Sequence, residues 1–114
     1  MSNYLDLSYI MDNVSDDPGF IKQLLSVFLE NLEPDYEVLR EVTVAGDHEH
    51  IKRTAHRMKS SFRSLGMSTL ADLTQTIEKS AHAKEELQSI RSMVDELGSQ
   101  VPMAVGEVEL YLNS

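Results

Sequence analysis

The spacing of the apolar residues between Ile51 and Leu65 is the feature that most constrains the fold. Ile51, Ala55, Met58, Phe62 and Leu65 follow one another at intervals of four, three, four and three residues. Residues with this period share one face of an α-helix, so the segment is expected to form an amphipathic helix with one continuous buried stripe. Such a helix needs other helices to cover its stripe.

His56 lies outside this stripe. At about 100° of rotation per residue, its side chain is expected roughly 140° from the centre of the stripe, in solvent. Lys52, Lys59 and Arg63 fall on the same flank, so cations precede and follow the histidine at helical intervals. A surface histidine among basic residues is often only part of a solvated helix face, and the period alone does not separate that interpretation from a functional site.

Further segments have the period of a helix. A short helix is expected within residues 4–14, covering one end of the core. A long helix is expected to begin at Pro18, with Asp17 as its cap, and to continue with a kink through Pro34 as far as Gly46. Its predicted buried face consists of Phe20, Ile21, Leu24, Leu25, Phe28 and Leu32.

The helix of the apolar stripe is expected to begin after Asp47 and to end at Gly66, where a left-handed residue fits. Ser68 or Thr69 is expected to cap the next helix, and a last helix is expected between residues 87 and 112. No strand pattern competes with these helices. The sequence therefore predicts an all-α fold, an antiparallel up-down four-helix bundle with a short extra N-terminal helix, in which residues 1–114 form a single domain.

The charge of the chain limits its partners. Its net charge is −9, with 19 acidic and 10 basic residues, which argues against binding to nucleic acid or to an anionic membrane. Residues 51–71 nevertheless contain half of the basic residues and no acidic one, an arrangement that suits an anionic group or an acidic pocket. Cysteine, a membrane-spanning run and a signal-peptide pattern are all lacking, so a cytoplasmic location is expected.

The sequence around and after the histidine resembles the motif of the histidine phosphotransfer (HPt) domains of two-component phosphorelays. Those domains carry a His, a Lys three residues later, small residues at the next two positions, a Gly ten residues after the His, and then Leu and Glu or Gln on the next helix. The matching residues are His56, Lys59, Ser60, Ser61, Gly66, Leu70, Leu73 and Glu78. The resemblance covers about residues 5–112, with one departure: the family usually has glycine where this chain has Ser60.

The resemblance implies that His56 accepts a phosphoryl group from the phosphoaspartate of one receiver domain and passes it to the aspartate of another. It also implies that Glu78 accepts a hydrogen bond from Nδ1 of the histidine, which would leave Nε2 unprotonated as the nucleophile. The spacing supports this pairing, because both residues reach nearly the same height on two antiparallel helices joined by a short turn. We expect Lys59 to stabilise the charge of the phosphoryl group.

The partners implied are response-regulator receiver domains and a hybrid sensor kinase. Lys52 and Arg63 are expected to take part in docking, while Ser60 and Ser61 leave room for the incoming domain. The family works without a cofactor of its own, since the Mg²⁺ belongs to the receiver. The chain also has no glycine-rich loop of the kind that cradles nucleotide phosphates, so it is not expected to be an ATP-dependent kinase.

Two other classes of protein stay open at this point. The chain could be a helical interaction module that binds a partner without chemistry, or the dimerisation part of a sensor kinase. The latter fits poorly, because such parts are two-helix hairpins, whereas this chain has enough helices for a bundle of its own and is expected to be a monomer.

The sequence alone does not distinguish a stand-alone protein from an excised domain of a hybrid kinase, and it does not identify the receivers or the direction of transfer.

Overall fold

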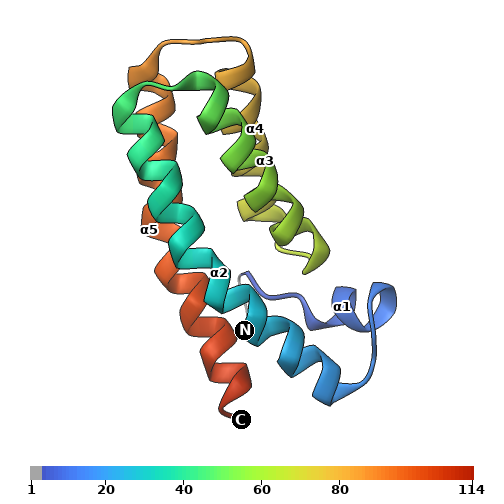
Figure 1. Ribbon diagram of the computed structural model, residues 1–114. Helices are drawn as coiled ribbons and strands as arrows, with labels where there is room; N and C mark the ends of the chain where they lie inside the picture. The colour runs from blue at the N-terminus through green and yellow to red at the C-terminus, as the bar shows by residue number, and fades with distance from the viewer. Residues whose placement is uncertain (1–3) are drawn as a thin grey trace.

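A computed structural model describes residues 4–114, which form five α-helices and no strand (Figure 1). The helices are α1 (Leu7–Asn13), α2 (Pro18–Ala45), α3 (His48–Ser64), α4 (Ser68–His82) and α5 (Leu87–Leu112). Helix α2 packs against α3 and α5, and α4 also packs against α3 and α5, so the four longer helices close a ring. This arrangement confirms the predicted four-helix bundle with a short extra N-terminal helix.

The ends of α2 and α3 have the signals expected from the sequence. The carboxylate of Asp17 accepts a hydrogen bond from the backbone N–H of Gly19, and Pro18 occupies the first helical position, where no donor is needed. Gly46 and Gly66 have φ angles of 72° and 70°, the left-handed conformation that lets a helix end in a tight turn. Both α2 and α5 continue as helices through their internal prolines.

The predicted cap of α4 is wrong. Met67 is the N-cap residue of this helix, and no side chain caps it by a hydrogen bond. The turn after α3 is so short that Ser68 is already the first helical residue. Met67 is instead held by burial, with only 1% of the residue exposed.

The core forms around the apolar stripe of α3. Its members Ile51, Ala55, Met58, Phe62 and Leu65 are each at most 1% exposed, as their spacing predicts. The ring of Phe62 meets that of Phe28 on α2 edge to face, with the ring centroids 5.9 Å apart. Because this face of α3 is fixed against α2 and α4, its opposite face is presented to solvent.

The bundle is elongated, with extents of 43 × 22 × 22 Å, because α2 and α5 run past the ends of α3 and α4 (Figure 1). Helix α1 lies near the turn between α3 and α4, where Tyr9 packs so closely on Gly66 that a Cβ there would be 2.8 Å from the Tyr9 side chain. Phe20 was predicted to be buried but is 44% exposed, since the first turns of α2 extend beyond α3 and α4. No helix within residues 4–114 is long and apolar enough to cross a lipid bilayer.

Candidate functional site

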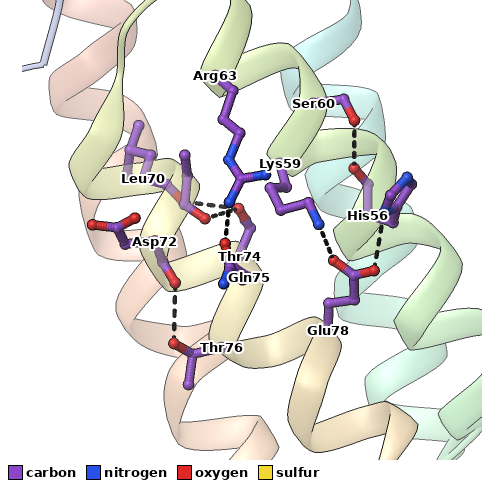
Figure 2. Close-up of polar contacts among 11 residues, drawn as sticks. His56, Lys59, Ser60, Arg63, Leu70, Asp72, Thr74, Gln75, Thr76 and Glu78 are labelled. Carbon is purple, nitrogen blue, oxygen red and sulfur yellow. Dashed lines mark hydrogen bonds and ion pairs between the residues drawn. The ribbon is translucent and has the colours of Figure 1, made fainter.

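His56 stands on the solvent face of α3, with 60% of its side chain exposed. This is the position expected from the apolar stripe. Figure 2 shows the ring beside α4, from which Glu78 reaches toward it. The imidazole is therefore accessible to a partner while one of its edges is held by the neighbouring helix.

The ring of His56 is oriented by Glu78. Its Nδ1 lies 2.9 Å from Oε2 of that carboxylate (Figure 2). An ionised carboxylate can only accept a hydrogen bond, so Nδ1 carries the proton and Nε2 of the neutral ring keeps its lone pair. The short turn between α3 and α4 brings the two residues to nearly the same height along their antiparallel helices, as the sequence spacing predicts.

The same carboxylate also binds Lys59. The Lys59 ammonium donates a hydrogen bond to Oε1 of Glu78 over 2.6 Å, and the lysine side chain is only 13% exposed. Glu78, itself 20% exposed, thus uses one oxygen for the lysine and the other for the histidine. This shared contact was not predicted from the sequence, which placed Lys59 beside His56 without a partner.

The charge state of Glu78 follows from these contacts. Partial burial, the largest single influence, raises the pKa of its carboxyl group, but the hydrogen bonds from Lys59 and His56 together lower the pKa below its usual value. The carboxylate is therefore ionised at neutral pH, where it serves as the acceptor for both neighbours.

An open groove runs between α3 and α4 beside the histidine, with a volume of about 530 Å³. Its lining residues are Lys52, Lys59, Arg63, Gln75, Glu78, Lys79 and His82. Four of these are Lys or Arg and one is a carboxylate, in a chain whose net charge is −9. The segregation of charge seen in the sequence is therefore a basic groove in the fold.

The groove includes residues that sequence reasoning missed. Lys79 and His82 lie in the last turn of α4 and follow Gln75 at helical intervals, which could have placed them on the same face. Arg63 donates a hydrogen bond to the neutral amide of Gln75, so this contact leaves its charge uncompensated. Lys52 pairs with Glu49 on its own helix, 3.2 Å away.

The two serines after Lys59 add little bulk to the surface. Ser60 Oγ donates a hydrogen bond to the backbone oxygen of His56 over 3.1 Å, and Ser61 Oγ donates to that of Arg57 over 3.4 Å. Both hydroxyl groups thus fold back onto α3 rather than extending outward. No bulky side chain therefore projects from the helix surface at these two positions next to the histidine.

On its other flank α3 borders an apolar hollow of about 140 Å³, shared with α2. Ser61 lines this hollow together with Val27 and Phe28, and Val27 is 48% exposed. The hollow could not be predicted from the sequence, because it depends on how α2 and α3 lie against each other. The exposed face of α3 is therefore basic on the side of α4, while on the side of α2 it borders this apolar hollow and the ion pair of Arg57 with Asp35, 3.1 Å apart.

The remaining histidines have other surroundings. Nε2 of His48 lies 2.9 Å from the backbone oxygen of Glu85, in the loop before α5, and Nδ1 of His50 lies 3.6 Å from the carboxylate of Asp47. Across residues 4–114, no three histidine or acidic side chains gather in a group that could hold a metal ion. Among these histidines, only His56 is paired with a carboxylate from a neighbouring helix in the described part of the chain.

Comparison with known families agrees with this geometry. The model of the Hpt domain family matches residues 23–100, which is more than half of the 114 residues and includes both His56 and Glu78. The chain belongs to the Hpt domain family, whose members carry out histidine phosphotransfer in two-component phosphorelays. No curated protein matched the chain, and no solved structure did.

Proposed function

We propose that His56 accepts a phosphoryl group from the phosphoaspartate of a receiver domain and passes it to the aspartate of a second receiver. The observation that carries this proposal is the hydrogen bond from Nδ1 of His56 to Glu78 on a side chain that is 60% exposed. It leaves Nε2 as an accessible nucleophile. A hybrid sensor kinase carrying the first receiver would be the source of the phosphoryl group.

In the transfer step, the Nε2 lone pair attacks phosphorus in line with the bond to the aspartyl oxygen. The N–P bond forms, the P–O bond breaks, and the aspartate leaves as a carboxylate. Charge on the equatorial oxygens needs a cation nearby, and Lys59 is one helical turn from the histidine. The Mg²⁺ that receivers use would enter with the partner and would help to neutralise the charge of the transferring group.

Docking would use the face of α3 around the histidine. Ser60 and Ser61 are small and do not project far from α3, so a receiver could bring its aspartate close to Nε2. Lys52 and Arg63 line the basic groove and would attract the acidic pocket of a receiver. The charges would then speed encounter, and the small side chains would permit close approach.

A direct test mixes the protein with a receiver domain that carries a labelled phosphoaspartate. The label should move to this chain, and the product should be labile in acid and stable in alkali, as a phosphohistidine is. If the receiver binds but the label stays on it or is released as free phosphate, the chain is a non-catalytic interaction module. A phosphotransfer profile against all receivers of the source organism would then identify the donor and the acceptor.

Ser60→Leu is expected to weaken receiver binding, because a branched side chain on α3 would hold the partner away from the histidine. Ser60→Gly should bind like the parent, since it only removes a hydroxyl that bonds to its own helix. Titration calorimetry would measure both affinities, and circular dichroism would check that the fold is retained. Equal affinity of Ser60→Leu and the parent would show that the receiver docks elsewhere.

Lys59→Ala is expected to slow transfer or shorten the lifetime of the phosphohistidine by about tenfold or more, with little change in receiver binding. A charge-assisted contact contributes ~1.5–3 kcal/mol, and 1.4 kcal/mol corresponds to a factor of about 10. Single-turnover transfer and the decay of the phosphorylated form would give the two rates. Arg53→Ala, which removes another cation of α3, serves as the control, and equal effects of the two changes would contradict a specific role for Lys59.

The chain is expected to be a monomer, because its four long helices already bury one another's apolar faces. Light scattering at micromolar concentration should therefore give the mass of one chain, 12.9 kDa. A stable species of twice that mass would revive the interpretation as a kinase dimerisation part.

A further inference from the structure

We infer that Glu78 is the resting partner of Lys59, and that phosphorylation of His56 makes the lysine exchange this carboxylate for the phosphoryl group. The inference rests on the proposed function and assigns Glu78 a positioning role beyond the orientation of the histidine ring. It concerns a contact that the chain forms before any partner arrives.

Glu78 connects the two groups that the transfer needs. Oε1 accepts from the Lys59 ammonium at 2.6 Å, and Oε2 accepts from Nδ1 of His56 at 2.9 Å (Figure 2). The lysine and glutamate side chains are only 13% and 20% exposed, so water screens their contact weakly compared with a surface pair. In this resting arrangement the carboxylate neutralises the lysine, and the ammonium is held toward α4 beside the ring.

The transfer step changes the charge on both sides of Glu78. The ring enters neutral, with its proton on Nδ1, and Nε2 gives its lone pair to phosphorus. Because the Nδ1 proton stays in place, the phosphorylated ring carries a formal positive charge, while the phosphoryl oxygens bring about two negative charges at neutral pH. The aspartate of the donor leaves with the electron pair of the broken P–O bond, so the step is balanced without another reactant.

These charges favour an exchange of partners. The ring cation now lies against Oε2 of Glu78 and competes with Lys59 for the same carboxylate. The phosphoryl oxygens offer the lysine a more highly charged acceptor nearby, and the long flexible side chain of lysine can swing between the two. One ion pair in the resting protein becomes two after transfer: Glu78 with the ring, and Lys59 with the phosphoryl group.

The exchange depends on a carboxylate at this position. A glutamine would accept the same hydrogen bond from Nδ1 and would fix the same tautomer. Its neutral amide would neither hold the lysine as strongly nor balance the charge of the phosphorylated ring. Glu78→Gln therefore separates the orientation of the ring from the exchange proposed here.

The first measurement follows the lysine side-chain ammonium groups by ¹⁵N NMR before and after phosphorylation of the full chain with phosphoramidate, which needs no receiver. The Lys59 signal should shift strongly, whereas that of Lys52, in the same groove but paired with Glu49, should shift much less. In Glu78→Gln the Lys59 ammonium should exchange faster with water before phosphorylation and regain protection afterwards. A Lys59 signal that moves no more than that of Lys52 would overturn the exchange.

The second measurement is the hydrolysis rate of the phosphohistidine as a function of pH. A protonated phosphoimidazole loses its phosphoryl group faster, so the rate should fall where Nδ1 gives up its proton. Loss of a neighbouring opposite charge should move this midpoint down by about one pH unit in Glu78→Gln. Glu41→Gln removes one exposed carboxylate from α2 and should leave the midpoint unchanged.

Three outcomes are distinguishable from these data. If His56 takes up the phosphoryl group but the midpoint of Glu78→Gln equals that of the parent, the exchange is wrong and the proposed function stands. If phosphoramidate and a phosphorylated receiver both leave His56 unmodified, the proposed function itself fails. A shifted midpoint together with a displaced Lys59 signal supports the inference.

Discussion

Replacement of His56 by glutamine is expected to reduce the uptake of phosphoryl label to background. Glutamine has no nucleophilic nitrogen with a free lone pair, so no N–P bond can form, although its amide can still contact Glu78. Because the side chain is 60% exposed and outside the core, the fold should be retained. The measurement is the label recovered on the chain after incubation with a phosphorylated receiver.

The other histidines provide matched controls. His48→Gln, His50→Gln and His82→Gln should each take up label like the parent, since none of these side chains is paired with Glu78. Circular dichroism on all four variants would exclude unfolding as the cause of any loss. Label that survives in His56→Gln, or that disappears in one of the three controls instead, would show that the site has been assigned to the wrong residue.

Phe62→Ala is expected to lower the free energy of unfolding by about 3–5 kcal/mol, the range found for loss of a large aromatic side chain from a core. Phe62 is fully buried in the stripe of α3, and its ring packs edge to face on that of Phe28. The expected loss is a large part of the about 5–15 kcal/mol that stabilises a typical domain. Urea unfolding followed by circular dichroism would measure it.

Phe62→Leu tests the same position with a smaller cavity and should cost less than Phe62→Ala. Arg53→Ala on the exposed side of α3 should stay within about 0.5 kcal/mol of the parent. A loss below about 1 kcal/mol for Phe62→Ala would mean that α3 is not anchored by its apolar stripe. The outward orientation of His56, which depends on that anchor, would then need another explanation.

The sequence predicted those parts of the site that depend on rotation about a helix axis. The period of the apolar stripe fixes which side of α3 is buried, and therefore that His56 is exposed. The ten residues from His56 to Gly66 and the twelve from Gly66 to Glu78 fix their similar heights, because rise per residue is constant in a helix. Rotation about the helix axis and height along it are both local properties of the chain.

Properties that depend on how two helices meet were not predictable in this way. Phe20 has the period of a buried residue, but period gives no position along the bundle axis. The first turns of α2 lie beyond the ends of α3 and α4, so Phe20 stays exposed. The contact of Lys59 with Glu78 requires a particular side-chain conformation across two helices. The apolar hollow beside Ser61 likewise exists only once α2 is placed against α3.

The basic groove was predictable from the sequence only in part. The cations of α3 were visible in the sequence as a run without acidic residues, whereas Lys79 and His82 joined them only when α4 was placed alongside. The body of the protein is acidic, so this groove should attract an anionic partner to one face and leave the others free. A rise in ionic strength should accordingly slow association with a receiver.

The most direct test of the central claim identifies the atom that carries phosphorus. The protein, labelled with ¹⁵N in its histidine rings, would be phosphorylated by its receiver or by phosphoramidate and studied by ³¹P and ¹⁵N NMR. The account predicts one phosphorus bonded to Nε2 of His56, with Nδ1 protonated and hydrogen-bonded to Glu78. Phosphorus on Nδ1 of this ring, on another side chain, or on no residue at all would contradict it.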